Sequence, residues 1–193
     1  MRVNLVLAAL FLVASFPAFS QVAPTATNDS GFPLVVGVGF SNFYTDWSGR
    51  LDGVTVWADS DFYRGPSFLH GFGIEAQGRD LNFGRTGTDP KLRLDTAALG
   101  AIYTWRHYRN FQPYAKFLGG ILSIDFTDTP TYSHDTRTDY APGGGVEYRV
   151  GRNVRVRADY EYQFATDFFN HHALNPNGVT VGASYDFGHI HAR

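Results

Sequence analysis

The clearest pattern along the chain is a strict alternation of apolar and polar residues near the C-terminus. One face of this stretch carries Val154, Val156, Ala158, Tyr160, Tyr162 and Phe164, and the other carries Arg155, Arg157, Asp159, Glu161 and Gln163. A period of two separates residues onto two faces only in an extended strand. The segment therefore predicts a β-strand with one apolar and one charged face.

The same period recurs along most of the chain and predicts eight strands. They cover residues 34–44, 51–59, 68–80, 92–105, 112–124, 139–150, 154–166 and 178–188. The fourth of these has no clear faces. The third sets Phe68, Phe72, Ile74 and Ala76 against Gly71, Gly73, Glu75 and Gln77, with His70 on the apolar side.

The connections between these strands differ in length. Those at 107–111 and 151–153 are short, whereas those at 81–91, 125–138 and 167–177 are long. Short turns at one end and long polar loops at the other are typical of barrels in outer membranes. The connections at 45–50 and 60–67 fit this scheme less well. The predicted fold class is all-β, an eight-stranded antiparallel transmembrane up-and-down β-barrel.

The first twenty residues differ from the rest of the chain. Arg2 precedes an apolar run that Pro17 closes, and small residues stand at Ala18 and Ser20. The run is too short to span a bilayer as a helix and is typical of a secretory signal peptide. We expect a signal peptide at 1–20, a flexible segment at 21–33, the barrel at 34–188 and a tail at 189–193.

Alternation alone leaves open which face points into the barrel. The aromatic girdle candidates gather at opposite ends of two antiparallel strands: Tyr160, Tyr162 and Phe164 on one, Tyr185 and Phe187 on the other. Two membrane interfaces require such a distribution, which favours an apolar face turned to lipid. The alternative is a secreted lipocalin-like soluble barrel with its apolar face inside.

The opposite face combines glycines with charges. Its glycines include Gly37, Gly39, Gly71, Gly73, Gly145 and Gly182, which leave space for long side chains inside a narrow barrel. Its charged residues are the candidates for ion pairs in the lumen: Glu75, Arg79, Lys116, Glu147, Arg149, Arg155, Arg157, Asp159 and Glu161. Acids and bases are nearly balanced, as buried charges require.

Composition excludes several classes of site. The chain has no cysteine, so disulfides, thiolate metal sites and cysteine nucleophiles are absent. Its 16 Lys and Arg residues against 18 Asp and Glu residues argue against a nucleic acid as partner, because phosphate binding needs a basic field.

Five segments carry a resemblance to a known family: VVGVGFSNF (35–43), PYAKFLGGI (113–121), YAPGGGVEYRV (140–150), RVRADYEYQF (155–164) and GVTVGASYDF (178–187). The chain resembles the small outer-membrane β-barrels of the OmpA/OmpX type, which are porin-like proteins of Gram-negative bacteria. The resemblance implies a monomer in the outer membrane, in contact with lipid and lipopolysaccharide. It also implies insertion by the outer-membrane assembly machinery, with Phe187 as the terminal aromatic residue.

The candidates for catalysis and metal binding are weak. Some lipid A deacylases of similar shape use a serine, a histidine and an acid, but His171 and His172 have no serine beside them. A water-facing tail accounts for His189 and His191, and a water-facing loop accounts for Asp125, Asp128, His134, Asp135 and Asp139. Trp47, Trp57 and Trp105 are expected to anchor at the membrane interface. PGGG at 142–145 opens a strand and is no phosphate site.

These observations predict a structural protein without a cofactor, a metal site or catalytic residues. Its lumen is largely closed by ion pairs, because eight strands leave an interior just wide enough for side chains. Its long loops are available for surface contacts. A lipid A-modifying enzyme remains an alternative.

Overall fold

The computed structural model describes residues 34–46, 49–61, 70–83, 92–106, 110–126, 133–165 and 174–187. They form β1 (Leu34–Thr45), β2 (Gly49–Asp61), β3 (Phe72–Phe83), β4 (Leu92–Thr104), β5 (Phe111–Phe126), β6 (Ser133–Arg149), β7 (Val154–Tyr162), β8 (Phe164–Ala165) and β9 (Asn177–Asp186). The predicted signal peptide, the segment at 21–33 and the tail at 189–193 lie outside the described residues.

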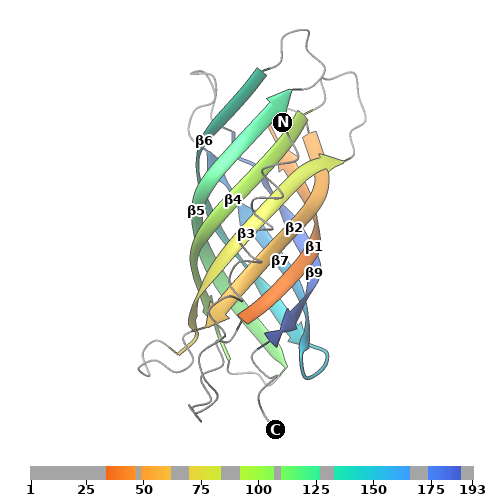
Figure 1. Ribbon diagram of the computed structural model, residues 1–193, viewed down its shortest axis with the longest axis vertical. Helices are drawn as coiled ribbons and strands as arrows, with labels where there is room; N and C mark the ends of the chain where they lie inside the picture. Colours follow the sequence, from red (N-terminus) through yellow and green to blue (C-terminus); the bar gives the residue numbers. More distant parts are fainter. Residues whose placement is uncertain are drawn as a thin grey trace, which may run out of the picture. The chain divides into compact units, whose positions relative to one another are not determined.

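The strands form one closed antiparallel sheet (Figure 1). Its order is β5-β4-β3-β2-β1-β9-β7-β6-β8, and an additional pairing of β5 with β6 closes the ring. A path along paired residues leaves β1 at Leu34, passes Ile74, Phe117 and Tyr162, and returns to β1 at Tyr44, ten residues further along. This stagger tilts the strands against the barrel axis. The predicted antiparallel barrel is confirmed.

The predicted seventh strand is present as two pieces, β7 and β8, which both pair with β6. The register that joins Gly143 to Glu161 and Tyr140 to Phe164 brings Pro142 opposite Tyr162. Proline has no N–H to donate, so the ladder lacks a hydrogen bond at this point. The two pieces together occupy one strand position of an eight-stranded barrel.

The barrel has two distinct ends. At the turn end, β1 begins, β9 ends and the connection at 150–153 joins β6 to β7, with the Asp186 N–H donating to the Asn153 carbonyl. The opposite end, called the loop end below, holds the end of β1, the start of β2, the end of β5 and the start of β6. Strands β5 and β6 reach beyond the others (Figure 1).

The prediction of a long loop at 125–138 is wrong. Residues 133–138 continue β6 and pair with 121–126 of β5. Both faces of 133–138 carry polar residues, so no alternation of apolar and polar residues marks this segment as strand. The third strand also begins later than predicted, at Phe72, because Gly71 occupies a turn at φ 101°.

Apolar side chains cover the outer surface of the barrel. The exposed large ones include Val38, Phe40, Val54, Val56, Phe72, Ile74, Leu99, Phe117, Ile121, Val156, Val179 and Val181. Aromatic residues flank them at both ends. Tyr185, Phe187, Tyr103, Trp105 and Tyr148 lie toward the turn end, and Tyr44, Tyr140, Tyr160, Tyr162 and Phe164 toward the loop end. The apolar belt with two aromatic rims is the surface that a bilayer requires.

The interior is divided into two layers. Charged residues fill the half near the turn end, whereas the half near the loop end holds an apolar cluster: Phe43, Leu51, Leu81, Leu92, Leu94, Leu122, Ile124, Ala165 and Leu174. Strand β4 contributes Leu92 and Leu94 to this cluster while Leu99 faces outward. Apolar residues thus lie on both faces of β4, which is why its sequence shows no alternation.

Candidate functional site: the charged lumen

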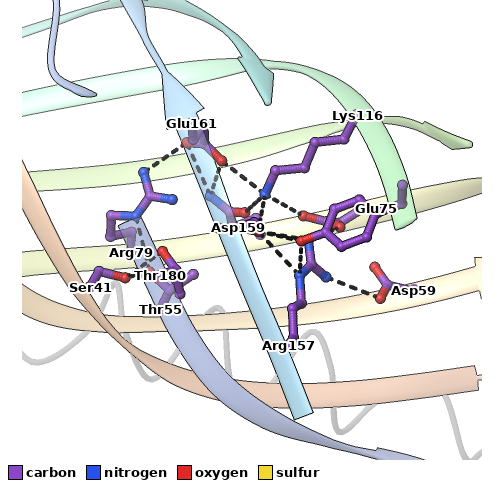
Figure 2. A network of polar contacts seen from close by, with 12 residues as sticks. Ser41, Thr55, Asp59, Glu75, Arg79, Lys116, Arg157, Asp159, Glu161 and Thr180 are labelled. Carbon is purple, nitrogen blue, oxygen red and sulfur yellow. Dashed lines mark hydrogen bonds and ion pairs between the residues drawn. The ribbon is translucent and has the colours of Figure 1, made fainter. Parts of the chain in front are cut away.

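Arg157 lies at the centre of the lumen and holds carboxylates from three strands (Figure 2). Its Nη2 donates to Glu75 Oε2 at 2.7 Å, and its Nη1 lies 3.3 Å from Asp59 Oδ2. Its Nε donates to Tyr114 Oη at 2.6 Å and to Asp159 Oδ2 at 3.1 Å. The side chain is 1% exposed. A guanidinium offers five N–H donors, so one arginine can satisfy several buried carboxylates at once.

Lys116 forms a second centre beside Arg157. Its ammonium lies 3.1 Å from Glu75 Oε1, 3.0 Å from Asp159 Oδ2 and 2.9 Å from Glu161 Oε2. It also donates to Gln77 Oε1 at 2.9 Å. Glu75 and Asp159 are shared by both cations, so the two centres form one network that joins β3, β5 and β7.

Arg79 extends the network toward the loop end. Its Nη1 lies 2.8 Å from Glu161 Oε1, and its Nε donates to Thr55 Oγ1 at 3.0 Å. Its guanidinium carbon lies 4.0 Å from the centre of the Phe43 ring, in the apolar cluster. Arg79 therefore spans the boundary between the two layers of the interior.

Arg155 forms a third group near the turn end. Its Nη1 lies 3.1 Å from Glu147 Oε2, and its Nη2 lies 2.5 Å from Asp186 Oδ2. Glu147 is also within 4.0 Å of Arg157 Nη1, which connects this group to the central network. Asp186 ends β9, so the ion pair ties the last strand to β6 and β7.

The structure brings eight of the nine lumen candidates into ion pairs, and Arg149 is the exception. Arg149 ends β6 at the turn end, is half-buried and makes no ion pair within the described ranges. Its backbone N–H donates to the Asn110 carbonyl at 2.9 Å. Its Nε is buried and has no hydrogen-bond partner among the described residues.

Several members of the network were not among the sequence candidates. They are Asp59, Gln77, Tyr114 and Asp186, all buried. Asp139 is buried as well, but neither of its carboxylate oxygens has a hydrogen-bond partner among the described residues. Gln77 and Asp186 lie on the polar faces of the predicted strands, so the alternation pattern carried a signal for them. Asp59 shares a face with Thr55 in β2, opposite the exposed Val54 and Val56. The same pattern could have identified it.

The prediction that Trp57 anchors at the membrane interface is wrong. Its side chain lies inside the barrel, 3% exposed, with the Arg157 guanidinium carbon 4.8 Å from its ring centre. A Cβ on Gly37 would lie 2.2 Å from Trp57 Cε2, and one on Gly182 would lie 2.8 Å from Cη2. These glycines leave the space that the indole fills. Trp105, in contrast, is exposed in the outer rim, and Trp47 lies outside the described residues.

The other sequence candidates lie in several parts of the chain, and among them Asp125 and His134 are in contact. Asp125, His134 and Asp135 lie on β5 and β6, and Asp139 lies inside the barrel. Asp128, His171, His172, His189 and His191 lie outside the described residues. Gly143 and Gly145 of the PGGG segment face the lumen, where a Cβ on Gly143 would lie 3.1 Å from Lys116 Cε.

Chemically, this site is a set of buried ion pairs in which six carboxylates share four bases. Each buried base in it contacts at least two acids or polar groups of the barrel. The cations therefore bind side chains of the protein's own interior. Within the described residues, no three His, Asp or Glu side chains gather in a way that could hold a metal ion. The described part of the chain also contains no helix long and apolar enough to cross a membrane.

Comparison with solved structures supports the same architecture. Neisserial surface protein A is 15% identical, with a TM-score of 0.63 over 82% of this chain and 98% of that chain. Ail of Yersinia pestis is 15% identical, with a TM-score of 0.57 over 81% and 99%. The N-terminal β-barrel domain of Pseudomonas aeruginosa OprF is 14% identical, with a TM-score of 0.52 over 79% and 97%. At these identities the likeness concerns the fold.

A search of curated protein sequences finds no match. The sequence profile of the outer membrane protein β-barrel domain, however, matches residues 6–187, which is nearly the whole chain. The closed sheet, the apolar belt and the charged lumen agree with this match. The chain belongs to the outer membrane protein β-barrel family.

Proposed function

We propose that the protein is a structural component of the outer membrane, with a closed lumen and with loops that make surface contacts. The filled interior carries this proposal. The ion-pair network occupies the half near the turn end, and the apolar cluster occupies the half near the loop end. An eight-stranded barrel has room for little more than these side chains. Passage of solutes and catalysis inside the lumen are therefore not part of the proposed function.

Export and assembly follow the resemblance. Residues 1–20 direct export, and Phe187 at the turn end serves as the terminal aromatic for the assembly machinery. The protein functions as a monomer that contacts lipid and lipopolysaccharide through its apolar belt. The exposed residues of that belt support the lipid contact.

The surface contacts are assigned to the loop end, where the longest strands extend beyond the belt. One structure shows Ail in complex with the heparin analogue sucrose octasulfate, so a barrel of this fold can form a complex with a polyanionic sugar. The present chain has a slightly negative formal charge of -2. We assign no polyanion to it on this basis, only the use of the loop end for contacts.

Liposome swelling tests the closed lumen. Purified protein refolded into phospholipid vesicles should admit arabinose no faster than vesicles without protein, whereas a general porin in parallel vesicles should admit it rapidly. The double variant Lys116→Ala, Arg157→Ala removes both network centres and should increase the rate if it inserts. Rapid swelling with the unchanged protein would contradict a closed lumen.

A further inference from the structure

Two cross-strand pairs on the outside of the β5–β6 hairpin bring a hydroxyl, an imidazole and a carboxylate together. Ser123 pairs with Thr136, and Asp125 pairs with His134. His134 Nδ1 lies 2.6 Å from Asp125 Oδ1, and His134 Nε2 lies 3.1 Å from Thr136 Oγ1. Ser123 Oγ lies 3.2 Å from Thr136 Oγ1 and 3.5 Å from His134 Nδ1. The lumen network uses none of these four side chains.

The roles of the two ring nitrogens follow from their partners. An ionised carboxylate only accepts hydrogen bonds, so in the neutral ring Nδ1 carries the proton and donates it to Asp125. Nε2 then carries the ring's lone pair and lies 3.1 Å from Thr136 Oγ1, within the distance over which a general base takes a proton. This order of acid, imidazole and hydroxyl is the one that activates a hydroxyl nucleophile.

The exposure of the groups suits a reaction at the surface. The Asp125 side chain is 18% exposed, so it holds the ring with limited competition from water. The His134 side chain is 48% exposed, and Thr136 is exposed beside it. A substrate can therefore reach the hydroxyl and the base from outside without a change in the barrel.

The position of the site indicates the kind of substrate. Ser123 stands two residues beyond Ile121 in the same outward row, and Ile121 is 51% exposed in the apolar belt. Two residues of strand correspond to about 7 Å. The hydroxyls thus lie at the edge of the surface that contacts acyl chains, at the depth where an amphiphile places the carbonyl groups next to its chains.

We propose that this group is a catalytic site that hydrolyses carboxylic esters of amphiphiles at the membrane surface. Thr136 Oγ1 attacks the ester carbonyl carbon as His134 Nε2 takes its proton. The carbon–oxygen bond to the alcohol breaks, and His134 returns the proton to the departing alkoxide, which leaves an acyl ester on Thr136. Water then attacks this ester by the same proton transfers, which releases the carboxylic acid and restores the threonine.

The roles of the remaining two residues follow from their contacts. Asp125 is a positioning residue, since its carboxylate contacts the ring at Nδ1 and fixes which nitrogen bears the proton. Ser123 Oγ accepts a hydrogen bond from the Thr136 hydroxyl at 3.2 Å, and this hydroxyl turns toward His134 Nε2, 3.1 Å away, when its proton is transferred. The site is independent of the closed lumen. A failure to find ester hydrolysis would therefore leave the proposed structural role intact, and a permeable lumen would leave the proposed hydrolysis intact.

Hydrolysis of p-nitrophenyl decanoate in detergent micelles tests the proposal. The refolded chain should release nitrophenol. The His134→Ala and Thr136→Val variants should hydrolyse the ester at least tenfold more slowly. Asp125→Asn should lower kcat, and this change in kcat should be larger than any change in KM. Thr138→Val is the matched control, because Thr138 is also exposed on β6 but contacts neither ring nitrogen within the described residues, and its rate should be unchanged. The shift of the folded band on heating in SDS confirms that each variant forms the barrel.

Two results would overturn the proposal. One is a rate for the unchanged chain that equals that of His134→Ala prepared in parallel, since the four residues would then only stabilise the hairpin. The other concerns the nucleophile. A fluorophosphonate probe followed by peptide mass mapping should modify Thr136, and modification of Ser123 instead would refute the assigned attack.

Discussion

Arg157 and Glu75 form a 2.7 Å ion pair across the lumen although 82 positions separate them in the sequence. Arg157 belongs to β7 and Glu75 to β3, with β9, β1 and β2 between them in the sheet. Their pairing therefore bridges the barrel through its interior, independently of the backbone ladders. Both side chains are at most 1% exposed, so each depends on the other for neutralisation.

Replacement of Arg157 by leucine should strongly destabilise the barrel. The change leaves Glu75, Asp59 and Asp159 with fewer partners in a buried site, and loss of one member of a buried pair costs about 3–5 kcal/mol. Arg157→Lys keeps the charge but loses the fork geometry and should cost less. The free energy of unfolding can be measured by urea titration in phospholipid vesicles.

Arg152→Leu is the control for this experiment. Arg152 is exposed in the connection between β6 and β7, so its loss should change the free energy of unfolding by no more than about 0.5 kcal/mol. Equal effects of the two leucine variants would mean that the lumen pairs do not stabilise the fold.

The alternation pattern predicted the parts of the barrel in which one face contacts lipid and the other faces charges. Strands β7 and β9 meet this condition along their length, so both their faces and their aromatic ends could be read from sequence. Strand β4 does not meet it, because Leu94 belongs to the apolar interior while Leu99 faces outward. Where the lipid-facing and the inward-facing side of a strand both carry apolar residues, the sequence shows no period of two.

The start of β6 and the site on it were not predicted for the opposite reason, because both faces of the strand are polar there. Beyond the belt, His134 and Thr136 face outward while Asp135 and Arg137 lie on the other face, so both faces are polar. The sequence therefore resembles a loop. Trp57 was misplaced for a different reason, since its burial depends on the space beside Gly37 and Gly182, on two other strands.

Gly37→Ala should destabilise the barrel through Trp57. The new methyl group would overlap the indole at 2.2 Å, and overpacking of this kind costs about 1–3 kcal/mol. In a Trp57→Leu background the same substitution should cost much less, because the smaller side chain leaves the space free. Gly151→Ala is the matched control, since a Cβ there meets no atom within 4 Å. Equal costs in both backgrounds would contradict the assigned contact.

Charge on the outer surface should have an effect that depends on its position. Val181 is 51% exposed in the belt and pairs with Phe40, so Val181→Arg should cost about 2–4 kcal/mol in a bilayer. Asn82 is exposed on β3 near the loop end, and Asn82→Arg should cost about 0–1 kcal/mol. Urea titrations in vesicles measure both. Equal tolerance at the two positions would indicate that water, rather than lipid, covers the belt.

The absence of cysteine in the chain allows its orientation to be determined with single labels. Asp46 is exposed at the loop end, and Arg152 is exposed at the turn end. The loops of outer-membrane barrels face outward and their short turns face the periplasm. On intact cells, a membrane-impermeant maleimide should therefore label Asp46→Cys and spare Arg152→Cys, while both should react after lysis. Labelling of Arg152→Cys alone on intact cells would reverse the orientation and would place the Thr136 hydroxyl on the periplasmic side, where the esters of the outer leaflet could not reach it.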